Sequence, residues 1–266
     1  MKIDSIPVGE QLRRWRRQRR LTQLDLALEA QVSTRHLSFV ETGRAAPSRE
    51  MVLRLSERLA VPLRDRNELL LAAGYAPMYR QRALDDPAMA AAHAAVQRLL
   101  TGHEPYPALA IDRHYNVVAA NRALPLLLEG VAPALLQPPI NLVRLSLHPD
   151  GVAPRIVNLL QLRGHLLDRL RQQVAASADP ALAALLDELR AYALPDGASD
   201  EPLAGELAGV LVPLQLRSRH GVLSFISTVT IFGTPNDVTL QELAIESFFP
   251  ADDFTAGVLR EVSTRA

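Results

Sequence analysis

The sequence predicts an α+β fold in two parts, an N-terminal all-α bundle of short helices and a C-terminal antiparallel sheet covered by helices. Helical periodicity with capping residues recurs up to Gly74, whereas alternating apolar runs separated by turns appear after residue 105. The charge divides in the same way. Residues 1–82 hold 16 Lys+Arg against 9 Asp+Glu, a net charge of +7, and residues 83–266 hold 13 against 20, a net charge of −7. This asymmetry is typical of a nucleic-acid-binding domain joined to a domain with another role.

Length and composition limit the possible classes of protein. At 266 residues the chain is long enough for two domains. The composition turns polar near residues 79–87, so we predict a first domain over 1–82, a connecting helix and linker over 83–104 and a second domain over 105–266. The absence of cysteine excludes disulfides and thiolate zinc sites. No apolar run is long enough to span a bilayer and no signal peptide opens the sequence, so we expect a cytoplasmic protein without a membrane partner.

The first predicted helix covers residues 8–20 and is rich in arginine. Val8, Leu12 and Trp15 share its core side. The other faces carry Arg13, Arg14, Arg16, Arg17, Arg19 and Arg20. These arginines either contact DNA phosphates or form a solvated face, and we favour phosphate contact for some of them because of the motif that follows.

Residues 22–42 predict two short helices joined by a tight turn. Thr22 and Asp25 have the spacing of a capping box at the start of the first helix. Leu24, Ala27 and Leu28 mark an apolar face of this helix. Residues 31–33 form the turn, whose last residue, serine, caps the second helix.

The second helix of the pair, residues 34–41, is the predicted DNA-reading element. It buries Leu37 and Val40, and Gly43 ends it. Two helices in this arrangement form a helix-turn-helix, which places the N-terminal residues of the second helix at base edges in the major groove. Two further helices, one capped by Ser48 and one over residues 63–73, complete a compact five-helix bundle.

Residues 9–77 resemble the Xre/Cro-type repressor domain found in MmyB-like regulators. The matching strings are LTQLDLALEAQVSTRHLSFVETGRAAPSREMVLRLSERLAVPL and RNELLLAAGYAP. One departure is Gln31, because such domains often place glycine in this turn, where the backbone adopts a positive φ.

The resemblance implies a double-stranded DNA operator as partner and assigns positions to the contacts. Gln23 matches a position that contacts phosphate or a base edge, and Arg44 lies where a backbone clamp is expected. Arg35 is suited to bidentate contact with guanine. The full set of DNA-binding candidates is Gln23, Ser33, Thr34, Arg35, His36, Ser38 and Arg44. For His36, a surface position without a role is an equally good interpretation.

The second part begins with a pattern typical of a PAS-like domain. After a predicted helix over 89–100, two short strands over 109–111 and 116–120 flank a turn, and Asn121 follows as the cap of a leucine-rich helix. Amphipathic helices are predicted over 156–174 and 181–194. Strands are predicted over 210–216, 222–232 and 243–249, although the last of these segments could also form a helix. The sum is about five antiparallel strands covered on one face by helices.

This part resembles the ligand-binding domain of MmyB-like regulators. The matching strings are YPALAIDRHYNVVAANRA and STVTIFGTPNDVTLQELAIESFFPADDFTAG. The resemblance implies a PAS-like sensor of a small apolar molecule, fatty-acid-like in character. Candidate ligand-binding residues are Asn121, Leu127, Arg144, Phe225 and Thr228, with polar groups to orient a head group and apolar groups to line the pocket. The alternatives are that the apolar residues fill a core, that Asn121 is a helix cap and that Arg144 lies on the surface.

Catalytic and metal-binding patterns are absent from the sequence. The seven histidines are scattered without an HxxxH or HExxH pair, and there is no G-x-S-x-G elbow or glycine-rich phosphate loop. We therefore expect no enzyme activity, no metal and no cofactor.

The sequence thus predicts a transcription regulator that binds DNA as a homodimer, since one short helix reads few base pairs and symmetric half-sites are the usual remedy. The resemblance implies that its second domain senses a small apolar ligand, such as a fatty acid. A different hypothesis makes that domain a ligand-free protein-interaction or dimerisation module. A third, an esterase fused to a DNA-binding domain, lacks a nucleophile motif.

Overall fold

The computed structural model describes residues 6–177, 179–195 and 211–265. Its contacts form two compact units. The first contains the chain up to Ala83 together with Gly233–Gln241, and the second contains Leu84–Phe232 and the chain from Glu242 onward. The backbone therefore passes between the units three times. Sequence analysis did not anticipate that residues 233–241 belong with the first unit.

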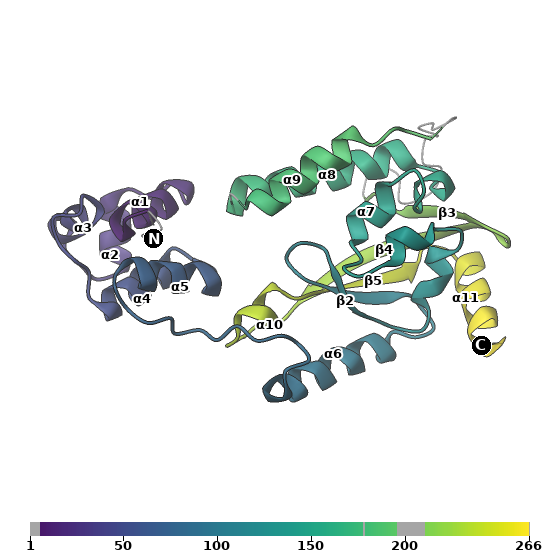
Figure 1. The fold of residues 1–266 in the computed structure, drawn as a ribbon, viewed down its shortest axis with the longest axis horizontal. Helices are drawn as coiled ribbons and strands as arrows, with labels where there is room; N and C mark the ends of the chain where they lie inside the picture. The colour runs from purple at the N-terminus through teal and green to yellow at the C-terminus, as the bar shows by residue number, and fades with distance from the viewer. Residues whose placement is uncertain (1–5, 178, 196–210, 266) are drawn as a thin grey trace. The chain divides into compact units, whose positions relative to one another are not determined.

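Five helices build the N-terminal part of the first unit (Figure 1). They are α1 (Val8–Gln18), α2 (Gln23–Glu29), α3 (Thr34–Glu41), α4 (Arg49–Arg58) and α5 (Leu63–Ala72). Their shared core is aliphatic and includes the fully buried side chains of Leu12, Leu26, Leu37, Leu55 and Leu69. Because each helix is short, this shared core rather than helix propensity supplies most of the stability.

The predicted caps of the helix-turn-helix are confirmed. Thr22 and Asp25 form a reciprocal capping box, and the side chain of Ser33 accepts a hydrogen bond from His36 N at 3.1 Å. Gln31, in the turn between α2 and α3, has a φ of 54°. The turn therefore has the left-handed backbone for which the related domains use glycine.

The predicted apolar face of α2 is wrong. Leu26 and Ala27 are buried, whereas Leu24 and Leu28 have exposed fractions of 65% and 78%. The spacing i, i+3, i+4 fits Leu24, Ala27 and Leu28, but a face rotated toward Leu26 satisfies helical periodicity as well. Ala30 completes the buried face.

The returning segment 233–241 closes the start of α5. Helix α5 begins after Pro62, which provides no side-chain cap. Instead, the backbone N–H of Leu63 donates to Oε1 of Gln241 at 2.6 Å. The segment is also held by a hydrogen bond from Val238 N to Arg80 O at 2.8 Å. A residue distant in sequence thus satisfies one of the free N–H groups of the helix.

The second unit contains a five-stranded antiparallel sheet. The strands are β1 (Ala108–Ile111), β2 (Val117–Ala120), β3 (Leu214–Ser218), β4 (Gly221–Ile231) and β5 (Ala244–Pro250), in the order β2-β1-β5-β4-β3. Glu246, in the central strand β5, lies opposite Leu109 of β1 and Val229 of β4. The predicted α+β class, with a helical bundle followed by an antiparallel sheet and helices, is confirmed.

Helices lie on both faces of the sheet, not on one face as predicted. Figure 1 shows α7 (Leu142–Leu147), α8 (Leu159–Ser177) and α9 (Pro180–Ala191) on one side and α6 (Ala90–Gly102) on the other. Helix α11 (Asp253–Arg265) contacts β4 and β5. None of the helices in the described part of the chain is long and apolar enough to cross a bilayer.

Several predicted elements differ in detail. The leucine-rich segment Leu124–Leu128 is a 3-10 helix, and α10 (Val238–Glu242) precedes β5. The strand predicted from residue 210 begins at Leu214, and residue 210 itself lies outside the described residues. The predicted strand over 243–249 is confirmed as β5, shifted by one residue.

Candidate DNA-binding surface and ligand cavity

The N-terminal turn of α3 presents polar side chains at the surface of the first unit. Ser33, Arg35 and His36 are exposed, whereas Thr34 and Ser38 are half-buried. The guanidinium carbon of Arg35 lies 5.5 Å from the ring centre of Phe39, one turn further along α3. This cation–π contact orients Arg35 while its donors stay accessible. Arg44, in the loop after α3, is also exposed.

A buried ion pair fixes the C-terminal end of α3. Arg16 of α1 donates to Glu41 through Nε at 2.7 Å and through a terminal nitrogen at 2.9 Å, and both residues are buried. Burial alone would raise the pKa of Glu41, but hydrogen bonds from Arg16 and Gln23 outweigh it and hold that pKa below its usual value. The pair therefore fixes the position of α3 against α1.

Gln23 belongs to this cluster as well as to the predicted DNA contacts. Its side-chain N–H donates to Oε2 of Glu41 at 2.8 Å, and the residue is half-buried. The amide nitrogen is thus engaged within the bundle. A contact of Gln23 with DNA stays a prediction.

The arginines of α1 and of the turn that follows it divide into structural and surface groups. Arg16 is occupied by Glu41, and Arg19 donates to the backbone oxygens of Leu59 and Ala60 at 3.0 and 3.2 Å. The exposed remainder comprises Arg13, Arg14, Arg17 and Arg20. The sequence could not separate these groups because the partners are distant in the chain.

Gly9 lets α1 approach α3 closely. A Cβ placed at Gly9 would lie 2.0 Å from the backbone oxygen of Val40. Glycine is therefore required where the two helices cross. Sequence analysis missed this position, for which the only local signal is a glycine within the first turn of a helix.

A cavity lies inside the second unit, between the sheet and the helices on its α7–α9 side. The space inside it that admits the centre of a water-sized sphere is about 90 Å³, and a wider empty volume of about 900 Å³ also counts space open to solvent. The lining is mainly aliphatic and includes Leu109, Leu124, Leu127, Leu145, Ile156 and Phe248. A largely apolar wall with a few polar groups is the usual composition of a small-molecule site.

Six polar or charged side chains of the described residues interrupt the apolar wall of the cavity. They are Tyr115, Ser146, His165, Arg169, Ser227 and Glu246. The guanidinium carbon of Arg169 lies 5.5 Å from the ring centre of Tyr115, and the Tyr115 hydroxyl donates to Gln173 at 2.5 Å. Polar groups of α8 therefore meet the tyrosine of the β1–β2 turn at the cavity.

Glu246 is the buried acid of the cavity wall, with an exposed fraction of 8%. Burial raises its pKa, and the positive charge of Arg169 opposes that shift only in part. Sequence analysis missed Glu246. Strand periodicity shows that alternate residues share a face, but it does not show which alternate set faces the ligand.

Leu127 is the one candidate of the five proposed from sequence that lines the cavity. Asn121 instead accepts a hydrogen bond from Ala108 N and donates to the backbone oxygens of Leu100 and Tyr106. It joins three segments and does not cap an α-helix.

The other three candidates are also placed away from the cavity lining. Arg144 forms a bidentate ion pair with Glu188 at 2.6 and 2.7 Å. Phe225 is fully buried in the core, in agreement with the alternative that the apolar candidates fill a core. Thr228 and its neighbour Ser227 are both exposed, and of the two only Ser227, one residue earlier in β4, lines the cavity.

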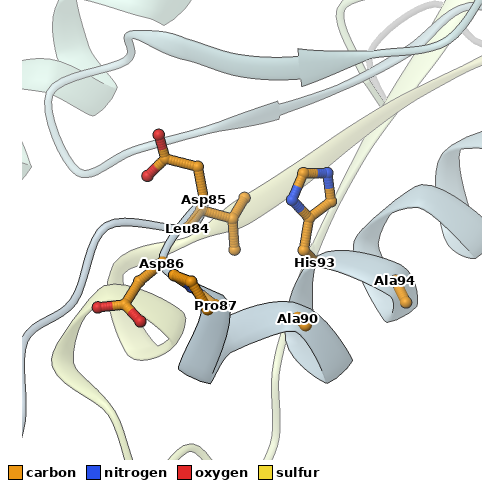
Figure 2. A pocket seen from close by; sticks show the side chains of 7 residues that line it. All are labelled: Leu84, Asp85, Asp86, Pro87, Ala90, His93 and Ala94. Carbon is orange, nitrogen blue, oxygen red and sulfur yellow. The ribbon is translucent and has the colours of Figure 1, made fainter.

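A second pocket lies at the start of the second unit, where α6 begins. Figure 2 shows its lining, with the Asp85 and Asp86 carboxylates directed away from the ring of His93. Asp86 accepts a hydrogen bond from Ala88 N at 2.8 Å and so caps the first turn. No cluster able to hold a metal ion occurs among the described residues.

Two family models match the chain. The MmyB-like transcription regulator ligand binding domain matches residues 92–262, more than half of the chain, and a helix-turn-helix model matches residues 12–65. No curated protein matches the chain. The two matched regions contain, respectively, the cavity and α3.

Proposed function

Because the chain belongs to the family of MmyB-like transcription regulators, we propose that α3 reads an operator and that a fatty-acid-like ligand in the cavity controls this binding. The chain is a DNA-binding transcription regulator with a ligand-binding domain. The ligand's chemistry, the residues that contact DNA and the homodimer are the parts that we propose here.

The exposed start of α3 carries the proposal for DNA. Arg35 and His36 are exposed on a helix whose opposite face buries Leu37 and Val40. Arg35 is suited to guanine, because its paired donors match the O6 and N7 acceptors at the major-groove edge. The exposed arginines of α1 supply positive charge for phosphate contacts, which fix the register of the protein on DNA.

Two copies of the chain are proposed to bind one operator. A single recognition helix contacts only a few base pairs, so symmetric half-sites increase both affinity and specificity. The ligand controls DNA binding in this proposal by favouring one arrangement of the DNA-binding units. The coupling equals the difference in the ligand's affinity between the two states.

The cavity supports an apolar ligand with a polar end. Its wall is dominated by leucine, and its charged side chains are few. A hydrocarbon chain would be favoured by roughly 25 cal/mol for each Å² of apolar surface that it removes from water. An aliphatic chain with one polar group fits this composition better than a strongly polar metabolite does.

A ligand-free dimerisation module is the second candidate for the second unit. The observation that favours it is the surface of β4, where Val229 and Ile231 have exposed fractions of 43% and 68%. Apolar side chains exposed together are typical of interaction surfaces. The cavity lends more support to a sensor, since a pure interaction module needs none.

DNA reading is tested with the Arg35→Ala variant of the full chain and selected operator sequences. We expect affinity for the preferred sequence to fall by about 1–3 kcal/mol, with weaker discrimination at one base position. Arg58→Ala removes an exposed arginine of α4 and serves as the matched control. Unchanged affinity and unchanged preference in Arg35→Ala would exclude α3 as the reader.

The ligand is tested by mass spectrometry of organic extracts of the purified protein and by titration with saturated fatty acids. A ligand that prefers the folded state must raise the melting temperature. At one hundred times its Kd, it raises the free energy of unfolding by about 2.7 kcal/mol. Leu127→Arg, which places a charge in the cavity wall, should abolish the shift. Absence of any bound lipid and of any thermal shift would leave the dimerisation module as the better interpretation.

A further inference from the structure

Glu246 and Arg169 face the same cavity without being paired to each other. Glu246 lies in the central strand β5, and Arg169 lies on α8. Among the described residues, no ion pair joins their side chains within 4.0 Å. The cavity thus has an acceptor and a donor of opposite charge on its wall. A polar group of a ligand that reaches both side chains would bridge them.

The groups that face Glu246 come from several elements. Arg169 and His165 are one turn apart on α8, Tyr115 comes from the β1–β2 turn, and Ser227 lies on β4. Ser227 and Arg169 both act to lower the pKa of Glu246, but burial has the larger, opposite effect. The carboxyl therefore shares the cavity wall with a hydroxyl and a cation but forms no ion pair within 4.0 Å among the described residues.

From this arrangement we propose that the polar end of the cavity binds a carboxylic acid together with one proton, which the ligand shares with Glu246. The inference rests on the proposed function, because it specifies how an acidic apolar ligand is recognised. One ligand carboxylate accepts hydrogen bonds from Arg169. The proton lies between the ligand and Glu246, so that the pair carries one negative charge opposite the arginine.

The proton balance follows from the charges. Above the pKa of Glu246, both free carboxyls are ionised, and two carboxylates in one apolar site repel each other strongly. Binding then takes one proton from solvent, as the ligand carboxylate, the Glu246 carboxylate and one H⁺ form the bound pair. Below that pKa, Glu246 already holds the proton, and the ligand binds without proton uptake. Affinity for an acid therefore falls as the pH rises.

The experiment compares dodecanoic acid with dodecan-1-ol on the full chain by calorimetry between about pH 6 and about pH 8.5. We expect the acid's affinity to fall by up to about tenfold for each pH unit above the pKa of Glu246, because one proton is taken up. The alcohol's affinity should not change with pH. Titration in two buffers of different ionisation enthalpy counts the protons directly.

Substitutions at Glu246 and Arg169 test which residue holds the shared proton and which supplies the positive charge. Glu246→Gln keeps the shape and a hydrogen-bond donor, so its acid affinity should be independent of pH and higher than wild type at the alkaline end. Asp168→Asn is the matched control, since Asp168 is exposed on α8 and pairs with Arg171. Arg169→Gln should weaken the acid by at least about tenfold and the alcohol little, while Arg169→Lys keeps the charge and most of the binding.

The outcomes separate this inference from the proposed function. Acid binding to wild type that stays independent of pH on both sides of the Glu246 titration, or a slope that persists in Glu246→Gln, overturns proton sharing and leaves the fatty-acid ligand standing. Binding of the alcohol but not of the acid overturns the acidic ligand and proton sharing together. Binding of neither compound, by wild type or by Glu246→Gln, overturns both proposals. Binding of the acid by Glu246→Gln but not by wild type overturns proton sharing and leaves the acidic ligand standing.

Discussion

Among the described residues, each unit of the molecule buries one glutamate, and the pKa values of the two are shifted in opposite directions. Glu41, in the first unit, has an exposed fraction of 5% and accepts hydrogen bonds from two nitrogens of the Arg16 guanidinium. Glu246, in the second unit, has an exposed fraction of 8% and faces a cavity without an ion pair. Burial raises the pKa of Glu246, whereas the pKa of Glu41 is lowered despite its burial.

The difference shows how to distinguish a charged group that holds the protein together from one that is available to bind a ligand. The hydrogen bonds of Glu41 are used within the bundle, so this residue fixes helices and has no binding capacity left. Glu246 is costly to ionise as it stands, because burial disfavours its charged form and no ion pair within 4.0 Å offsets this among the described residues. A group kept at such a cost is a candidate for binding something that is not part of the chain.

The largest effect is expected from breaking the structural pair. Arg16→Met leaves Glu41 buried without its counter-charge and should destabilise the first unit by about 3–5 kcal/mol. Thermal unfolding and hydrogen exchange in α1 and α3 measure the loss, and operator binding should decline with it. Arg14→Ala, an exposed arginine on the same helix, should change stability by less than about 0.5 kcal/mol.

The double variant of this pair sharpens the test. Replacing both Arg16 and Glu41 with apolar residues removes the unpaired charge, so most of the stability should return. If Arg16→Met alone were as stable as wild type, the ion pair would not hold α3 in place. Glu41 would then not differ from Glu246 in having a structural role.

The next effect has the opposite sign and comes from the unpaired glutamate. A raised pKa means that the folded chain holds a proton that the unfolded chain releases, so stability falls as the pH rises from the usual value of 4.5 toward the raised value. Glu246→Gln should therefore raise stability at about pH 8, by about 1–3 kcal/mol, and change it little at about pH 4. Thermal unfolding at both pH values measures this.

Glu188 provides the matched control within the same unit. Hydrogen bonds from Arg144, the largest contribution, lower its pKa to about 2. Its stabilising effect is therefore present above the usual value of 4.5 and is lost as the pH falls toward 2. Glu188→Gln should lower stability at neutral pH. If Glu246→Gln and Glu188→Gln changed stability in the same direction, the ion pairing of the carboxyl would not determine whether its replacement stabilises or destabilises the protein.

The parts of the fold that were predictable from sequence depend on local patterns. Thr22, Ser33 and Ser48 cap helices in the structure as their spacing indicated. These signals involve residues within one turn of each other, and physical chemistry relates them directly to a backbone conformation. The strands of the sheet were recognisable for the same reason, from alternation over a few residues.

The parts that were not predictable depend on distant partners or on a choice between faces. Arg16 and Glu41 are 25 residues apart, and nothing in either local pattern connects them. For α2, two rotations satisfy the same periodicity, and only packing selects the one that buries Leu26. For the cavity, the sequence indicated an apolar site and included Leu127, but the choice between Ser227 and Thr228 required the register of β4.

The smallest effect concerns backbone strain, which the two units also treat differently. Gln31 and Tyr115 both have a positive φ, at 54° and 65°. Tyr115 is buried at the cavity and its hydroxyl is hydrogen-bonded, so its contacts compensate for the strain. Gln31 is exposed in the turn before α3 and has no comparable packing. The strain at Gln31 is therefore removable without loss of contacts.

Gln31→Gly should raise the stability of the first unit by about 0.5–1 kcal/mol, because glycine adopts this conformation without the steric cost of a Cβ. Thermal unfolding measures the gain, and Gln31→Ala, which keeps the Cβ, should show none of it. Tyr115→Gly should be destabilising, since it removes a buried ring along with the strain. Equal stability of the glycine and alanine variants at position 31 would mean that the turn before α3 stores no removable strain.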